Sequence, residues 1–418
     1  MTDAADASAG AARRPRRICF VVPTHWAALM GGSQYQVKVL IEHLLEAYDV
    51  EIYFLTVKSD PQFRPQGYEI VQFSTMTGIR RYGHFLDAFR LYRALERIRP
   101  DIVYQQVGCG HTGIAAFYAR RAGARMIWRV SHDRTVSPPR LTWWRIHHRI
   151  EQKFLEYGIR HADLILAQTE IQKTRLAEHY GRDNVVVVPN FHPQPRRRAA
   201  DVPRRTRKRV AWVANLKPFK NPHAFARLAL KLRSRQDVEL VMVGAAMMPG
   251  RWTDELLQLI ETAPNLRYMG RLPQEQVNEL LEESDLLVNT SDHEGFSNVF
   301  IQAWMRRVPV VTLHVDPDGL LSERQLGCVS HDEDRLAEDV ERLLDDDALR
   351  EEIGERCRVY AAENHSTANI ERLARLLGLE RRRAVPAAGG TPEPRVIDGQ
   401  APNEAFEVLE LRPREVGS

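Results

Sequence analysis

Short apolar runs alternate with helical patterns through most of this chain of 418 residues. Between the first two runs, apolar residues recur at the helical spacing of three and four, from Val37 to Leu45. This alternation predicts βαβ units, in which parallel strands form a sheet and the connecting helices cover both of its faces. The predicted strands of the first half are Ile18–Val22, Glu51–Leu55, Asp101–Tyr104, Met126–Val130, Leu164–Ala167 and Val185–Val188.

A second series of runs begins after Phe191–Lys208, a segment rich in proline and arginine that is typical of a linker. Both series open with a strand, an irregular loop and a helix, so we expect two similar domains whose strand ends line a cleft. The strands of the second series are Val210–Val213, Leu240–Val243, Leu266–Met269, Leu286–Val288 and Val310–Leu313. The expected organisation is a disordered arm over 1–16, domains over 17–190 and 209–376 joined by a linker over 191–208, and a disordered tail over 377–418.

The composition is that of a soluble enzyme, with 44% hydrophobic and 27% charged residues. No run approaches the roughly 18 apolar residues of a transmembrane helix, and the N-terminus lacks the apolar core of a secretion signal. The cysteines have no metal-ligand spacing, as is typical of a reduced protein, and they are Cys19, Cys109, Cys328 and Cys357. We therefore expect a cytoplasmic protein without a bound metal.

Positive charge is concentrated in one stretch, although the net charge is only +4. Between Arg120 and Arg160 there are ten Lys or Arg residues against three acids, together with Trp128, Trp143 and Trp144. Such a mixture could bind an anionic membrane surface or an anionic acceptor, or it could be a solvated helix face whose tryptophans pack inward. No nucleic-acid recognition motif accompanies the charge, so we expect no nucleic-acid partner.

The clearest chemistry lies between Asp285 and Leu313. A buried strand is followed by a polar loop that contains Glu294, and an amphipathic helix opens near Ser297. Loops at the carboxyl ends of parallel strands bind ligands, and the free N–H groups of a helix's first turn favour phosphate. An acid beside an anion site is better suited to sugar hydroxyls than to phosphate, and a sugar attached to a diphosphate fits both halves of the loop.

Three further loops carry candidate residues. Gly31 and Gly32 permit a close backbone approach at the start of a helix, though they could equally form a tight turn capped by Ser33. His132 follows a predicted strand, where it could act on a ligand or serve as a structural hydrogen-bonding group. Lys220 follows the first strand of the second half, where the alternative is a solvated lysine.

The order and spacing of these motifs resemble the retaining family-4 (group 1) glycosyltransferases of the GT-B fold, from about residue 17 to 375. The resemblance implies two Rossmann-like, doubly wound parallel-sheet domains that face each other across a cleft. It also implies that the first domain binds the acceptor and the second a nucleotide-diphosphate sugar, without a metal or other cofactor. The catalytic residues that it implies are His132 near the donor sugar, Lys220 at the departing diphosphate and Glu294 at the sugar hydroxyls. The donor-binding residues that it implies are Gly31, Gly32, Asn215, Gly295, Phe296, Ser297, Asn298, Val299 and Gln302.

Two residues depart from the family pattern. Asn215 stands where the family has an arginine five residues before Lys220, and the loss of one such donor typically costs about 2.7–4 kcal/mol. We therefore expect compensation by Lys217 or by a basic residue of the first domain. Gln302 replaces a second glutamate, at a cost on the order of 1 kcal/mol in nucleotide affinity.

Two aspartate-rich segments need an interpretation, because many sugar transferases hold a metal with an Asp-x-Asp motif. Asp316-Pro317-Asp318 matches this motif, but a turn is the favoured interpretation of the segment. The run Asp345–Asp347 is expected to be solvated surface.

The expected function is sugar transfer with retention, in cell-surface polysaccharide or glycolipid synthesis. The acceptor would be a saccharide or a lipid-linked saccharide, and the protein could contact the inner face of an anionic membrane peripherally. The alternatives are a degenerate nucleotide-sugar-binding scaffold subunit, which Asn215 and Gln302 favour, and a nucleotide-sugar epimerase of the same fold.

Overall fold

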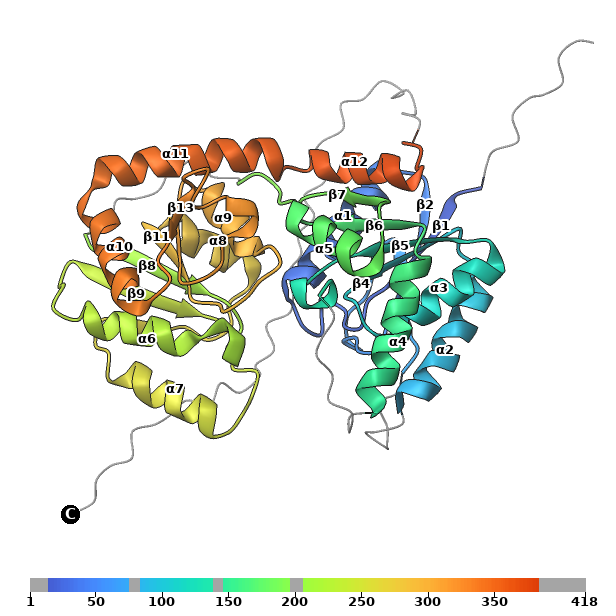
Figure 1. Ribbon diagram of the computed structural model, residues 1–418, viewed down its shortest axis with the longest axis horizontal. Helices are drawn as coiled ribbons and strands as arrows, with labels where there is room; N and C mark the ends of the chain where they lie inside the picture. The colour runs from blue at the N-terminus through green and yellow to red at the C-terminus, as the bar shows by residue number, and fades with distance from the viewer. Residues whose placement is uncertain (1–13, 75–82, 138–145, 196–205, 383–418) are drawn as a thin grey trace, which may run out of the picture. The chain divides into compact units, whose positions relative to one another are not determined.

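The computed structural model describes residues 14–74, 83–137, 146–195 and 206–382 (Figure 1). Residues up to Arg381 form one unit. Within the described ranges the first half builds a seven-stranded parallel sheet of order β3-β2-β1-β4-β5-β6-β7. Its strands are β1 (Arg16–Val21), β2 (Val50–Thr56), β3 (Tyr68–Gln72), β4 (Ile102–Gln106), β5 (Arg125–Arg129), β6 (Leu164–Ala167) and β7 (Val185–Val187).

The second half builds a parallel sheet of its own, six-stranded over the described residues, with the order β10-β9-β8-β11-β12-β13. Its strands are β8 (Lys208–Val213), β9 (Val238–Val243), β10 (Leu266–Tyr268), β11 (Leu286–Asn289), β12 (Val310–Thr312) and β13 (Gly327–Val329). The helices are α1 (Gly32–Ala47), α2 (Gly83–Ile98), α3 (Gly110–Ala122), α4 (Ile146–His161), α5 (Glu170–Tyr180), α6 (Pro222–Lys231), α7 (Arg251–Glu261), α8 (Gln274–Glu282), α9 (Asn298–Trp304), α10 (Glu333–Asp345), α11 (Asp347–Asn364) and α12 (Ala368–Leu377). Two Rossmann-like parallel-sheet domains were predicted, and that fold class is confirmed.

Every predicted strand is present, with small shifts at its ends, and two strands were not predicted. These are β3 and β13, and both lie at an edge of their sheets. Their residues are only partly buried or exposed. An edge strand that is covered incompletely needs few apolar residues, so its sequence lacks the continuous apolar run that marks a central strand.

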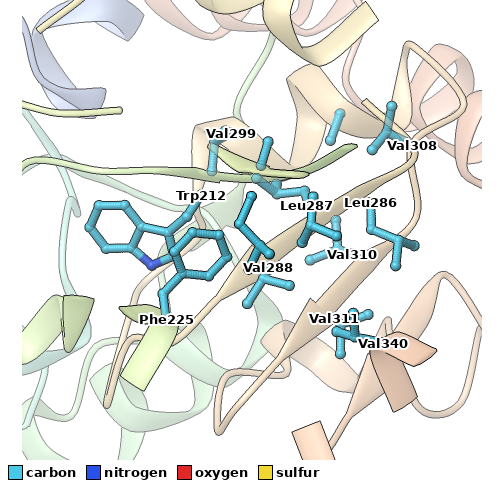
Figure 2. Close-up of a cluster of buried hydrophobic side chains, with 14 of the residues drawn as sticks. Trp212, Phe225, Leu286, Leu287, Val288, Val299, Val308, Val310, Val311 and Val340 are labelled. Atoms are coloured by element: carbon cyan, nitrogen blue, oxygen red, sulfur yellow. The ribbon is translucent and has the colours of Figure 1, made fainter. Parts of the chain in front are cut away.

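The core of the second domain surrounds strand β11 (Figure 2). Leu286 and Leu287 are 0% exposed and Val288 is 1% exposed. Consecutive side chains of a strand point to opposite faces, so this run is covered on both. Next to it, the rings of Trp212 and Phe225 stack with their centroids 6.3 Å apart. Each fully buried side chain of this size contributes about 1.5–3 kcal/mol, which fixes the strand end that carries the candidate loop.

Helix α12 belongs by its packing to the first domain. Ile370, Leu373 and Leu377 are buried in the same cluster as Ile18 and Phe20 of β1. The carboxylate of Glu371 binds His43 Nε2 at 2.7 Å and accepts a hydrogen bond from the Tyr48 hydroxyl at 2.6 Å. The last part of the segment 209–376, which was expected to be second domain, therefore completes the core of the first. The rest of the predicted boundaries remain predictions, since 1–13, 196–205 and 383–418 lie outside the described residues.

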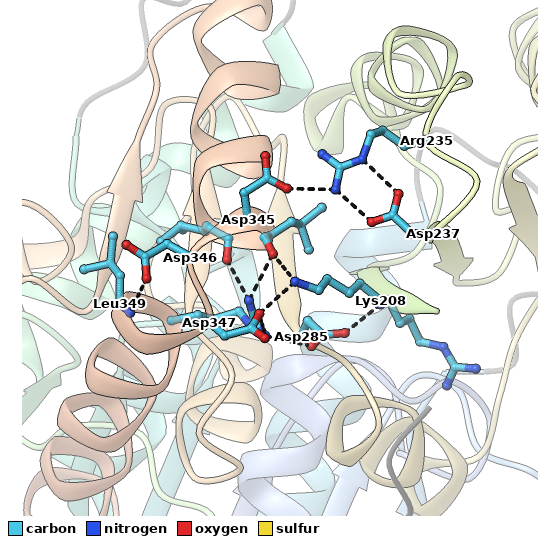
Figure 3. A network of polar contacts seen from close by, with 12 residues as sticks. Lys208, Arg235, Asp237, Asp285, Asp345, Asp346, Asp347 and Leu349 are labelled. Atoms are coloured by element: carbon cyan, nitrogen blue, oxygen red, sulfur yellow. Dashed lines mark hydrogen bonds and ion pairs between the residues drawn. The ribbon is translucent and has the colours of Figure 1, made fainter. Parts of the chain in front are cut away.

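The run Asp345–Asp347 joins several elements of the second domain (Figure 3). Asp345 accepts a hydrogen bond from Arg235 at 2.8 Å, and Asp347 accepts one from Lys208 at 2.7 Å. Asp346 caps helix α11 by accepting from the Leu349 N–H at 2.9 Å. Asp345 and Asp347 are more than half exposed, as expected of surface residues, but they also tie the junction of α10 and α11 to β8 and the loop before β9.

Candidate functional site

The loop after β11 is attached to the loop after β8. The Thr290 hydroxyl lies 2.9 Å from the carbonyl oxygen of Lys220 and 2.8 Å from that of Asn221. The Asp292 N–H donates to the Phe219 carbonyl at 2.9 Å. Since both loops leave the carboxyl ends of neighbouring strands, these bonds hold their side chains at one edge of the sheet.

Lys220 and Glu294 form an ion pair between the Lys220 Nζ and the Glu294 Oε1. The Ser291 hydroxyl donates to the same carboxylate oxygen at 2.9 Å. Only 17% of the Lys220 side chain and 7% of the Glu294 side chain are exposed. The structure thus brings together the two residues proposed for the diphosphate and for the sugar, and each neutralises the other in a place that is largely closed to water.

Phe219 organises the charged groups around it. The ammonium groups of Lys217 and Lys220 lie over its ring, 5.9 and 5.4 Å from the centroid. His293 stacks on the same ring, with a centroid distance of 5.2 Å and an interplanar angle of 27°. A ring face attracts cations, so Phe219 favours two positive charges beside one another.

His132 lies close enough to these groups to respond to their charges. Loss of water around part of the imidazole lowers the pKa of His132, although the residue as a whole is exposed. The carboxylate of Glu294 raises that pKa in part, whereas Lys220 and Lys217 lower it. The adjacent Asp133 holds the turn in place, since it accepts hydrogen bonds from Gln172 at 2.9 Å and from Arg175 at 3.2 Å. His132, Glu294, Lys220 and Lys217 therefore lie close enough to act on one another through their charges.

The glycine loop before α1 makes the close approach that two glycines permit. Gly31 occupies the N-cap of this 16-residue helix, which has no side-chain cap among the described residues and no acid in its first turn. A Cβ on Gly32 would lie 2.8 Å from the Asn298 Nδ2, which donates to the Gly32 carbonyl at 2.8 Å. The side-chain oxygen of Asn298, Oδ1, accepts from Gln36 at 3.2 Å and from Asn190 at 3.0 Å. Asn298 thus connects the loop at α9 with the loop at α1.

The segment 295–299 opens α9 as expected, with Ser297 at the N-cap. No side chain of the described chain caps this helix, and its first turn holds no acid, so its leading N–H groups favour an anion. Gly295 packs closely, because a Cβ there would lie 3.0 Å from the Gln172 Nε2. Phe296 and Val299 are 8% exposed, and the Phe296 ring packs on His365 with centroids 4.8 Å apart.

Gln302 and Asn215 have partners within the protein. Gln302 is 4% exposed, and its Nε2 lies 3.3 Å from the Nε2 of His192, which also lies 3.0 Å from the Tyr35 hydroxyl. Because His192 Nδ1 must donate to the Pro193 carbonyl at 2.8 Å, its Nε2 accepts. Asn215 accepts a hydrogen bond from the Ala245 N–H at 3.3 Å. The Gln302 and Asn215 side chains therefore both brace the surrounding structure.

Asp316 and Asp318 cap backbone N–H groups, which agrees with the turn that was favoured for them. Asp318 accepts from the N–H groups of Glu170 and Ile171 at 2.9 and 3.1 Å, at the start of α5. Asp316 accepts from the Leu321 N–H at 2.8 Å.

Sequence reasoning missed Phe219, Thr290 and His192. Phe219 could have been noticed from its place between two lysines, whereas the role of Thr290 depends on a partner 70 residues away in sequence. His192 lies in the segment that was interpreted as a linker, and no feature of the sequence indicated its contact with Gln302.

The structure thus has two parallel-sheet domains, with a lysine and a glutamate paired at adjacent strand ends of the second, as expected of a GT-B glycosyltransferase. The family model described as glycosyltransferase family 4 matches residues 30–194, and that of glycosyl transferases group 1 matches residues 207–346. The chain belongs to this group 1, family-4 class of glycosyltransferases.

Similar proteins include a D-inositol 3-phosphate glycosyltransferase of Corynebacterium diphtheriae, 26% identical over 242 residues, or 52% of this chain and 56% of that protein. An O-antigen chain mannosyltransferase B of Escherichia coli is 25% identical over 222 residues, or 49% of this chain and 57% of that protein. The chain thus spans little more than half the length of these curated relatives.

Solved structures show the same fold. Sucrose-phosphate synthase from Thermosynechococcus elongatus superposes with a TM-score of 0.70 at 14% identity, covering 87% of this chain and 98% of that one. Anabaena HepE in complex with UDP-glucose superposes with a TM-score of 0.69 at 16% identity, covering 87% and 99%.

Proposed function

We propose that this protein transfers a glycosyl group from a nucleotide-diphosphate sugar to an acceptor hydroxyl, with retention of the anomeric configuration. The observation that carries the proposal is the Lys220–Glu294 pair at the carboxyl ends of β8 and β11, within electrostatic reach of His132. A sugar diphosphate offers each partner a group to bind, namely an anion for Lys220 and hydroxyl donors for Glu294. HepE, of the same fold, is described in complex with UDP-glucose, which supports a donor of this class.

In the proposed reaction the bond between the sugar C1 and the diphosphate oxygen breaks as the acceptor oxygen bonds to C1 from the same face. The acceptor hydroxyl proton passes to the departing phosphate oxygen. Lys220, the N–H groups at the start of α9 and those of Gly31 and Gly32 would stabilise the diphosphate, so the proposal needs no metal or cofactor. The protein contributes positioning and charge stabilisation.

Thermal unfolding with UDP-, GDP- and ADP-sugars tests donor binding first. A donor that binds the folded protein at a concentration of 100 times its Kd adds about 2.7 kcal/mol to the free energy of unfolding, so the correct base should raise Tm measurably. No shift with any of the three at millimolar concentration would refute the proposal.

Turnover then separates the remaining alternatives. Transfer by the isolated protein excludes a scaffold subunit. Conversion of donor to an isomeric sugar without any acceptor would instead establish an epimerase.

For the acceptor, we propose a lipid-linked saccharide at an anionic membrane surface, reached from the cytoplasmic side. None of the helices in the described part of the chain combines the length and apolar character needed to span a bilayer. Trp128 is 0% exposed and packs inward, and Trp143 and Trp144 lie outside the described residues.

Exposed phenylalanines on α2 and α3 support the membrane contact instead. Phe89 on α2 is 59% exposed and Phe117 on α3 is 46% exposed. Arg93 lies over the Phe89 ring at 5.2 Å and Arg121 over the Phe117 ring at 5.9 Å. Apolar rings beside guanidinium groups are typical of a surface that meets anionic lipid headgroups.

Vesicle sedimentation tests this contact. We expect the wild type to sediment with anionic vesicles at low salt and less at high salt, because salt screens the arginine charges. Replacing Phe89 and Phe117 by serine should weaken sedimentation, whereas Met248→Ser, at a residue that is 47% exposed in the other domain, should not. No binding at low salt would exclude the membrane contact.

A further inference from the structure

The loop that carries Lys220 holds a second ammonium group. Residues Pro218–Lys220 form a single 3-10 turn, in which the Lys220 N–H donates to the Lys217 carbonyl at 3.0 Å. This tight turn places both side chains over the Phe219 ring, with the Lys217 Nζ 5.9 Å and the Lys220 Nζ 5.4 Å from its centroid. Two like charges are thus held next to each other by backbone geometry, against their mutual repulsion.

The two ammonium groups differ in their partners. Lys220 is paired with Glu294, whereas Lys217 has no carboxylate within ion-pair distance among the residues that the structure describes. Lys217 is also partly buried, and burial lowers its pKa, with a further lowering by Lys220 and an increase from Glu294. The Phe219 ring offsets only part of the cost of a partly dehydrated positive charge without a counter-ion, so this ammonium group is suited to bind an anion.

Asn215, two residues earlier, does not supply a charge to this place. Its side-chain oxygen accepts the Ala245 N–H and so fastens the loop after β8 to the loop after β9. Two basic residues of the first domain are not placed to supply it either. Arg175 pairs with Asp133. Arg129 is 0% exposed, and its Nη2 donates to the Val188 carbonyl at 3.2 Å, although its Nε and Nη1 have no partner in the described structure. Lys217, by contrast, acts on the same His132 imidazole as Lys220 does, so both cations belong to one site.

We propose that Lys217 provides the second positive charge for the leaving diphosphate, in place of the arginine that the family resemblance puts at position 215. This inference rests on the proposed sugar transfer. Lys217 contacts the diphosphate oxygens together with Lys220, and it is most important as the C1–oxygen bond breaks and negative charge accumulates on the departing phosphate. No proton leaves Lys217 in this step.

The test compares nucleoside diphosphate with nucleoside monophosphate binding, using UDP, GDP and ADP and their monophosphates in calorimetry. Loss of a charge-assisted contact should make Lys217→Met bind the preferred diphosphate about 10- to 100-fold more weakly, with a much smaller effect on the monophosphate. Lys217→Arg keeps the charge and should bind as the wild type does. Lys231→Met removes a lysine that pairs with Asp334 on the surface of the same domain, and it should leave both affinities unchanged.

A variant that moves the positive charge from position 217 to position 215 tests the proposal more sharply than its removal does. Adding Asn215→Arg to Lys217→Met should return most of the diphosphate affinity, and with it most of the transfer rate. We expect Lys217→Met alone to lower turnover by about 10²–10³-fold, as does removal of other donors at a developing anion. A double variant no better than Lys217→Met would overturn the equivalence of the two positions.

Other outcomes are equally decisive. If Lys217→Met binds the diphosphate as Lys231→Met does, Lys217 has no role at the diphosphate. If Arg134→Met, on the exposed turn after His132, loses diphosphate affinity and Lys217→Met does not, the compensating charge comes from the first domain. A wild type that binds none of the three diphosphates refutes the proposed function itself, and the inference with it.

Discussion

At the scale of single residues, Glu294 is surrounded by groups that stabilise its charge. It accepts from Lys220 and from the Ser291 hydroxyl, and only 7% of its side chain is exposed. Sequence motifs singled out Lys220, Glu294 and His132, because each follows a strand whose end is fixed by the fold. The structure pairs Lys220 with Glu294, and the roles of all three residues stay a prediction. Sequence motifs could not indicate the partner of Gln302. His192 is 110 residues away in sequence, and the contact forms only once the chain has folded.

Glu294→Ala should abolish use of the sugar donor and leave binding of the free nucleoside diphosphate nearly intact. The reason is that Glu294 would bind only the sugar hydroxyls, whereas Lys220 and the helix N–H groups would bind the diphosphate. Calorimetry with the diphosphate and transfer assays with the sugar donor measure the two effects separately. Asp292→Ala, at an exposed acid of the same loop, serves as the control and should change neither. Equal loss of both activities in Glu294→Ala would contradict this division of roles.

At the scale of elements, helices α3 and α4 cross at two glycines. A Cβ on Gly113 would lie 2.2 Å from the Phe154 carbonyl oxygen, and one on Gly158 would lie 2.6 Å from the Thr112 carbonyl carbon. Hydrophobic periodicity predicted the central strands well, since they are buried on both faces. It could not predict this crossing, because close contact between two backbones leaves no apolar pattern, only a glycine within a helix.

Gly113→Ala should lower the free energy of unfolding by about 1–3 kcal/mol, because backbone atoms of α4 must move to admit the methyl group. The gain in helix propensity, about 1 kcal/mol, offsets part of this cost. Gly110→Ala in the same helix is the matched control, since its Cβ would meet the Glu151 Cγ at an ordinary 3.4 Å. Urea unfolding of both variants measures the difference. Equal midpoints would contradict the expectation, because they would show that α4 can shift to admit the methyl group at little cost in free energy.

At the scale of the whole molecule, three histidines of the described residues are buried in the neutral form. Burial lowers the pKa of His25, His192 and His365 to about 4. They belong to different parts of the fold: His25 receives the Ala27 N–H at 3.1 Å, and His365 donates to the Asn190 carbonyl at 2.8 Å. Since the unfolded chain binds protons near pH 6.5 and the folded chain only near pH 4, all three couple folding to pH in the same direction.

We expect the protein to lose stability as the pH falls from about 6.5 towards 4. Each histidine contributes up to about 3 kcal/mol that is fully present above pH 6.5 and is lost through this window. Acidic residues such as Glu371, whose pKa is lowered to about 2, first by the hydrogen bond from Arg381, lose their contribution only at lower pH. Urea midpoints at pH 7 and pH 5 measure the effect.

His365→Asn provides the control for this pH dependence. The asparagine amide can keep the bond to the Asn190 carbonyl, and the other ring nitrogen, Nε2, has no hydrogen-bond partner in the described structure. The variant should therefore show a shallower decline between pH 7 and pH 5. A wild-type midpoint that does not change over this range would contradict the expectation.

Helix α12 has a consequence for any attempt to divide the molecule. Ile370, Leu373 and Leu377 fill part of the first domain although they come from the far end of the described chain. A fragment that stops at the linker would expose the apolar residues that face this helix and would be prone to aggregate. To prepare the first domain alone, the helix would have to be returned to it, either as a separate peptide or by circular permutation that places it ahead of β1.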